Sequence, residues 1–74
     1  TAQIGEFVII GNNCKIGKNT HIERSILWNN VEIEEGVHLV NSIIADNCKI
    51  AKFARINNGI VIGAGTKISS YSIL

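Results

Sequence analysis

Two histidines and two cysteines are the first candidates for catalysis or metal binding in this sequence. His21 and His38 are 17 residues apart, and Cys14 and Cys48 are 34 apart. A histidine can act as a general base or a metal ligand, and a thiolate can act as a nucleophile or bind zinc. Zinc sites in proteins use clustered ligands with paired spacings, which these residues lack. What they can do together depends on the elements that carry them.

An aliphatic residue recurs along the whole chain at steps of six residues. Two steps, from Ile22 to Leu27 and from Leu39 to Ile44, are five residues long. The recurring positions are Ile4, Ile10, Ile16, Ile22, Leu27, Ile33, Leu39, Ile44, Ile50, Ile56, Ile62, Ile68 and Leu74. A period of six excludes an amphipathic helix, whose apolar face recurs every three or four residues. It predicts short strands joined by corners, with the aliphatic residue and the residue two before it pointing inward.

Three such units make one coil of about eighteen residues, so the chain of 74 residues makes about four coils. The predicted fold is all-β, a single-stranded parallel β-helix of triangular section that occupies residues 1–74 as one domain. The corners carry Asn or Gly three residues after the aliphatic residue in most units, and these residue types tolerate a positive φ. The repeat is cut within a unit at both ends and the sequence has no Met, so we expect a fragment of a larger chain.

Charge is sparse and evenly spread, with seven basic and six acidic residues and a net charge of +1. A protein that binds nucleic acid is expected to carry a basic stripe for the phosphates, and no such stripe is present. No apolar run approaches the roughly 20 residues of a membrane-spanning helix. We therefore expect no direct nucleic-acid partner and no membrane association.

Stacking the units in columns places four aliphatic side chains on the outside of one face. They are the residues just before the inward positions of that face, and Trp28 follows one position after Leu27. We call this set the apolar strip: Ile9, Ile26, Trp28, Ile43 and Val61. A contiguous exposed apolar patch commonly marks an interface, so these five residues are the predicted contact surface. The alternative is that β-branched residues fill a solvent-facing strand because of their β-propensity.

The same columns decide how the histidines and cysteines are placed. Cys14 and Cys48 fall on one inward column two coils apart, a separation of about 9.6 Å that exceeds the roughly 7 Å limit for a disulfide. Two buried free thiols fit a reducing compartment, so a cytoplasmic location is expected.

His21 and His38 are stacked outward neighbours, and Phe53 and Tyr71 are neighbours at one corner. We predict no catalytic, metal-binding or cofactor-binding residue and no cofactor.

The motif resembles the hexapeptide repeat of left-handed parallel β-helices over essentially the whole chain, and that resemblance implies the left hand. Some enzymes with this repeat use a histidine as a general base, and others bind a metal through three histidines. This sequence has only two histidines, and no inserted loop of the kind found in the acyltransferases interrupts it. The resemblance therefore leaves His21 and His38 as surface residues.

A narrower resemblance rests on residues 25–33 and 41–50, which read SILWNNVEI and NSIIADNCKI. They are similar to a coil of the epsilon subunit of the eukaryotic guanine-nucleotide exchange factor that acts on translation initiation factor two. The gamma subunit and mannose-1-phosphate guanylyltransferases share much of this pattern. The resemblance implies a nucleotidyltransferase-like domain before the β-helix and a helical domain after it that performs the exchange.

On this resemblance the segment is a non-catalytic assembly domain that holds other subunits of the same complex. The alternative is the C-terminal oligomerisation or regulatory β-helix of a sugar-nucleotide pyrophosphorylase like the mannose-1-phosphate guanylyltransferases, or a hexapeptide acyltransferase. Because the end coils of a solenoid expose unpaired edges, the isolated fragment is also expected to be capable of self-association.

Overall fold

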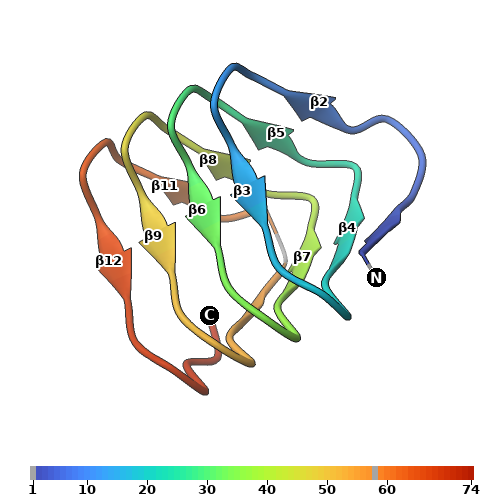
Figure 1. The fold of residues 1–74 in the computed structure, drawn as a ribbon, viewed down its shortest axis with the longest axis vertical. Coiled ribbons are helices and arrows are strands. Elements are labelled where there is room, and N and C mark those ends of the chain that lie inside the picture. Colours follow the sequence, from blue (N-terminus) through green and yellow to red (C-terminus); the bar gives the residue numbers. More distant parts are fainter. Residues whose placement is uncertain (1, 58) are drawn as a thin grey trace.

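The chain folds as a solenoid in which each strand lies beside the equivalent strand of the next coil (Figure 1). The computed structural model describes residues 2–57 and 59–74, and every regular element there is a β-strand. The twelve strands form three sheets of four parallel strands. The predicted all-β solenoid of about four coils is therefore confirmed. No helix among the described residues is long and apolar enough to cross a bilayer.

Each face of the triangular section is one sheet, which we name by its outward residues. The apolar sheet contains β2 (Ile9–Ile10), β5 (Ile26–Leu27), β8 (Ile43–Ile44) and β11 (Val61–Ile62). The charged sheet contains β3 (Lys15–Ile16), β6 (Glu32–Ile33), β9 (Lys49–Ile50) and β12 (Lys67–Ile68). The histidine sheet contains β1 (Gln3–Ile4), β4 (His21–Glu23), β7 (His38–Val40) and β10 (Arg55–Ile56).

Backbone hydrogen bonds between coils hold the strands in the predicted register. On the charged sheet the amide of Lys15 donates to the carbonyl of Val31 at 2.9 Å, and the amide of Glu32 donates to that of Cys48 at 2.9 Å. Because the strands have only two or three residues, each coil satisfies few of its backbone groups internally. The neighbouring coils supply the partners that buried amides and carbonyls require.

The core is a stack of aliphatic side chains along the solenoid axis. Seven of the recurring positions are at most 2% exposed: Ile22, Leu27, Ile33, Leu39, Ile44, Ile50 and Ile56. The recurring residues of the end coils are more accessible, and Ile4, Ile10 and Leu74 are exposed. These three residues belong to the first and last coils, which have a neighbouring coil on one side only.

Each corner contains one residue in the left-handed region of φ. The predicted Asn and Gly positions behave as expected, for example Asn13 at 60° and Gly36 at 70°. The structure adds Phe7 at 55°, Arg24 at 46° and Asn41 at 54°. The prediction places each corner three residues after the recurring aliphatic residue. It missed Arg24 and Asn41 because they lie in the two five-residue steps, where the corner comes one residue earlier. Phe7 was missed because its residue type gives no signal for this conformation.

At the corner after the apolar sheet, side-chain hydrogen bonds between coils come from the position just before the corner asparagines. Asn13, Asn30 and Asn47 are those asparagines, and they provide the left-handed conformation of the corner. The carboxamide oxygen of Asn29 accepts from the Asn12 amide at 2.8 Å, and the Asp46 carboxylate accepts from the Asn29 amide at 2.8 Å.

Candidate functional site

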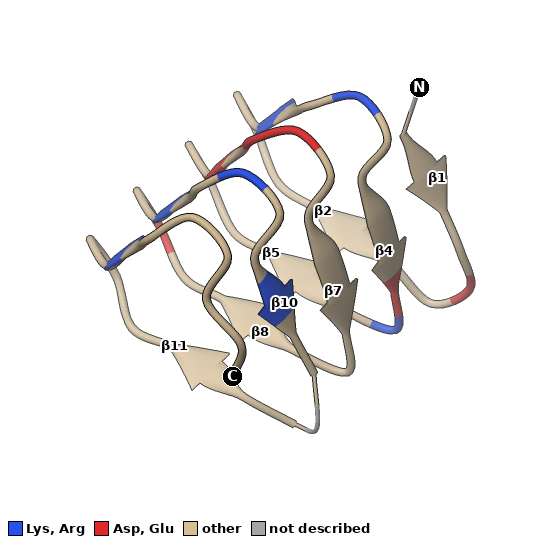
Figure 2. Ribbon diagram, turned by 90° about the horizontal axis from the view of Figure 1, so that it is seen from below, with Lys and Arg blue, Asp and Glu red and all other residues tan. Residues whose placement is uncertain are grey.

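The apolar strip forms one continuous band across the outside of the apolar sheet. Its strand residues are direct partners on neighbouring strands, since Ile9 pairs with Ile26, Ile26 with Ile43, and Ile43 with Val61. Ile26 is half-buried, while Ile9 and Val61 are 62% and 70% exposed. No charged residue lies on β2, β5, β8 or β11 (Figure 2). The predicted residues are therefore brought together on one accessible face.

Trp28 extends the apolar strip beyond the end of β5. It follows Ile26 by two residues, which places the two side chains on the same side of the strand. On the preceding coil the equivalent position is Gly11, where an added Cβ would lie 2.8 Å from the Trp28 carbonyl oxygen. The next coil has Ala45 there. Small neighbours leave the indole uncovered, and Trp28 is 53% exposed.

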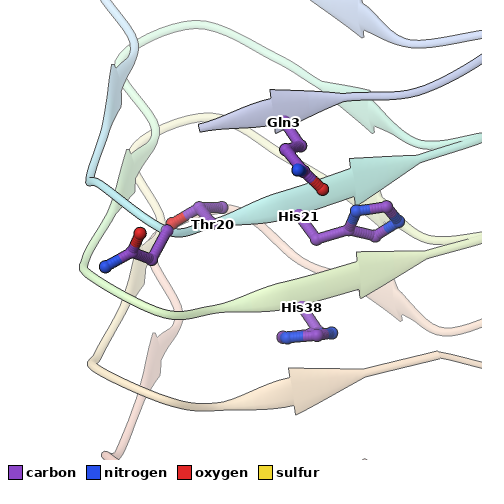
Figure 3. Close-up of a pocket in the computed structure, with 5 residues that line it drawn as sticks. Gln3, Thr20, His21 and His38 are labelled. Carbon is purple, nitrogen blue, oxygen red and sulfur yellow. The ribbon is translucent and has the colours of Figure 1, made fainter. Parts of the chain in front are cut away.

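His21 and His38 lie side by side on the outside of the histidine sheet, with ring centroids 5.8 Å apart and planes tilted by 37°. Figure 3 shows them beside Gln3 and Thr20 along the lining of an open hollow of about 250 Å³. The Thr20 hydroxyl donates to the Glu34 carbonyl at 3.0 Å, so its hydrogen is engaged within the solenoid. Among residues 2–57 and 59–74, no three His, Cys, Asp or Glu side chains gather as a set of metal ligands.

A charged network on the same sheet was not predicted from the sequence. Glu23 receives the Arg24 guanidinium at 2.9 Å and lies 3.2 Å from the His21 ring nitrogen. Arg24 also donates to the Asn41 carboxamide oxygen at 2.9 Å. The hydrogen bond from His21, and then the charge of Arg24, hold the pKa of Glu23 below the usual 4.5. The signal in the sequence was the pair of five-residue steps, since the strands at these steps, β4 and β7, are one residue longer than the others and Glu23 is the added residue of β4.

We expect the Glu23 carboxyl to titrate below pH 4.5 when its side-chain carbon resonance is followed by NMR. Because the pKa is lower in the folded chain, the stabilising contribution is present above the ordinary glutamate pKa and is lost as the pH falls through the lowered value. His21→Gln removes the main cause and is expected to move the pKa back up. An unchanged Glu23 titration in that variant contradicts the assignment.

A second hollow, of about 370 Å³, adjoins the first along the corner between the charged and histidine sheets. The two adjoining hollows share Asn19 and His38 in their lining, and we refer to the pair as the groove. The remaining lining of the second hollow is Gly36, Phe53, Arg55 and Tyr71. The two aromatic residues are neighbours, as predicted, and their rings stack with centroids 5.3 Å apart and planes within 18°.

Phe53 and Tyr71 occupy corner positions at a cost in backbone energy. Their φ angles are 60° and 62°, a region in which a residue with a side chain costs roughly 1–2 kcal/mol. An aromatic pair contributes about 0.5–1.5 kcal/mol beyond its buried area. Stacking alone therefore does not offset the conformational cost of the two residues. Asn19, on the same corner of an earlier coil, adopts this conformation with a residue type that tolerates it.

The two cysteines are free thiols that bond within the solenoid. The Cys14 sulfur donates to the Trp28 carbonyl at 3.0 Å, and the Cys48 sulfur donates to the Gly63 carbonyl at 3.0 Å. Cys48 is buried and Cys14 is half-buried. Both side chains fill the inner column as small residues, which is the role that the sequence predicts for them.

A comparison with protein families finds one that fits both the repeat and this geometry. The family described as the EIF2B subunit epsilon LbH domain matches residues 2–74. The chain belongs to this family. LbH denotes the left-handed β-helix, so the predicted hand and the predicted resemblance are both confirmed. A search of curated proteins gave no significant match.

Membership of the eIF2B epsilon LbH family places the solenoid in a subunit of a translation initiation factor. The match covers nearly all of the chain and adds no residue assignments to it. The apolar strip, the histidine pair and the aromatic corner are therefore defined by their geometry alone. The strip and the groove lie on different sheets, so substitutions can address each surface separately.

Proposed function

We propose that this LbH domain is a non-catalytic assembly surface, and that the apolar strip docks another subunit of the same cytoplasmic initiation factor. The observation that carries the proposal is the unbroken register of outward aliphatic residues from Ile9 to Val61, with Trp28 beside them. Interface cores are depleted in charge and enriched in aromatic residues, as this strip is. The strip holds no titratable group, so it can supply packing but no acid–base step.

Solvent-facing β-propensity accounts less well for the same pattern. The outward positions of the other two sheets include Lys15, Glu32 and Lys49 on one and His21 and Arg55 on the other. All three sheets have the same parallel geometry, so strand formation does not require an apolar exterior. The difference between the faces favours a partner that covers one of them.

The alternative function, an oligomerisation or regulatory β-helix of a pyrophosphorylase or an acyltransferase, predicts contact between copies of this chain. Membership of the eIF2B epsilon family favours other subunits of the factor as the partner. The two hypotheses are distinguished by one measurement, the composition of the complex that forms through the apolar strip. It contains other subunits under the first hypothesis and further copies of this chain under the second.

The double variant Ile26→Lys with Ile43→Lys is expected to abolish association with the other subunits while leaving the fold intact. Both substitutions lie at the centre of the apolar strip, where two lysines would be desolvated on docking. In the free domain each lysine can lay its stem along the sheet and keep its ammonium in water. Co-purification of the complex, with circular dichroism of the isolated variant, measures both results.

The variant Ser69→Lys with Ser70→Lys is the matched control, because it adds the same charge at exposed positions on another corner. It is expected to assemble like the wild type. If the strip variant also assembles normally, the strip is not the docking surface. If it loses only contacts between copies of this chain, the oligomerisation reading is correct instead.

A further inference from the structure

The groove beside the histidine sheet has a chemistry that the apolar strip lacks. It runs along the solenoid from Gln3 and His21 past His38 to Arg55, with Phe53 and Tyr71 on its corner side. None of the residues that line the two hollows is a carboxylate. Three of them, two imidazoles and one guanidinium, are basic or can become so. The lining therefore suits an anionic group.

The acidic side chains closest in sequence to groove residues already have partners, and one of these partners, His21, itself lines the groove. Glu23 binds Arg24 and lies against His21, and the Glu35 carboxylate lies 4.0 Å from the Lys18 ammonium. Within residues 2–57 and 59–74, Arg55 has no carboxylate within salt-bridge distance, whereas the other arginine, Arg24, is paired. An exposed guanidinium is the side chain best suited to bind a carboxylate in two places.

The aromatic corner adds an apolar wall to the groove. An added Cβ on Gly36 would lie 2.5 Å from two atoms of the Phe53 ring, so this ring lies directly against the glycine. The Phe53 ring also stacks on Tyr71, which is 71% exposed. An aliphatic side chain packs well against such an aromatic pair.

We propose that this groove binds an extended acidic peptide segment of a partner protein, with a carboxylate on Arg55 and the aliphatic side chain two residues away, on the same side of the peptide, against Phe53 and Tyr71. His38 and Asn19, which line both hollows, lie midway along the path. This binding is separate from the assembly role of the apolar strip.

The test uses a fluorescently labelled ten-residue peptide in which two Glu and two Leu residues occupy every second position, so that all four lie on one side of the extended chain. The peptide is titrated into the protein and its binding is followed by anisotropy. We expect saturable binding that weakens at higher salt. Arg55→Gln is expected to weaken it about fivefold, the upper range for an exposed charge pair. Lys67→Gln removes the same charge from the charged sheet and is expected to have no effect. Amide shifts in an NMR titration should concentrate at the groove.

The aromatic wall is tested by Phe53→Asn with Tyr71→Asn, which places at both corners the residue type found at Asn13, Asn19, Asn30 and Asn47. The variant is expected to fold, as circular dichroism will show, and to lose peptide binding. The proposal is overturned if the Glu peptide does not bind, if a peptide with Gln in place of Glu binds equally well, or if Arg55→Gln has no effect. Tighter binding of a ten-nucleotide oligouridine would also overturn it and indicate an RNA site.

The two proposals fail independently. Loss of assembly in the strip variant with peptide binding unchanged supports both surfaces as separate sites. Loss of peptide binding in Arg55→Gln with normal subunit assembly likewise supports the groove and the apolar strip as separate sites.

Discussion

Leu39→Ala is expected to lower the free energy of unfolding by about 3–5 kcal/mol. The Leu39 side chain is fully buried, and Leu39 pairs with Ile22 on the neighbouring strand β4 and with Ile56 on the neighbouring strand β10. Truncation leaves a cavity between two coils that are fixed by backbone hydrogen bonds and cannot close around it. Because domains of this size are stable by only about 5–10 kcal/mol, the loss is a large fraction of the total. Urea denaturation measures it, and the midpoint of thermal unfolding should fall by about 15 °C or more.

Leu74→Ala is the control for this prediction, since it makes the same substitution in the same column. Leu74 is 44% exposed and has a partner coil on one side, through the hydrogen bond of its amide to the Arg55 carbonyl. Its expected cost is below about 1 kcal/mol. Equal losses in the two variants would show that the inner column is not the main source of stability.

Gly17→Ala is expected to destabilise the fold by about 1–3 kcal/mol, the cost of forcing an extra carbon into a packed region. A Cβ at this position would lie 2.7 Å from the Glu34 carbonyl carbon and 2.7 Å from the Glu35 nitrogen. Both contacts are with backbone of the next coil, so no side chain can rotate away. The two coils have to separate, which lengthens the hydrogen bond between the Gly17 amide and the Ile33 carbonyl, now 2.8 Å. Urea denaturation and amide hydrogen exchange at Gly17 measure the two effects.

Gly63→Ala tests whether the coil contact, and not the loss of glycine, is responsible. Gly63 has the same place in the repeat, directly after an inward isoleucine, and no heavy atom lies within 4 Å of an added Cβ. Neither glycine is in the left-handed region of φ. Gly63→Ala is expected to be neutral or to stabilise by up to about 1 kcal/mol, because it restricts the unfolded chain. A similar loss in both variants contradicts the packing explanation.

The fold was predictable from the sequence because its core repeats in a simple way. Inward side chains of successive coils stack directly on one another, so Ile22, Leu39 and Ile56 obey one local rule that can be read along the chain. The outward column of Ile9, Ile26, Ile43 and Val61 follows from the same register. The residues of the candidate docking strip were therefore identified correctly as neighbours, although their role is a proposal.

The charged network and the groove were less predictable because they depend on side-chain direction at the corners. A five-residue step moves Arg24 into the left-handed conformation and brings its guanidinium to Asn41 on the next coil. The sequence places Phe53 and Tyr71 at neighbouring corners, but it does not show that the Phe53 ring lies over Gly36 and borders the groove. These features depend on where a side chain points after the turn, which the period of the repeat does not specify.

The amino-acid sequence by itself determined the period, the core column, the faces of the solenoid and the stacking of His21 on His38. Only the tertiary structure decided which of these positions are accessible, which charges are paired and where the surface is hollowed. The physical reason is that burial in a solenoid follows from a repeated spacing of neighbouring coils. Exposure and pairing depend instead on the length and rotation of individual side chains such as Trp28, Glu23 and Arg55.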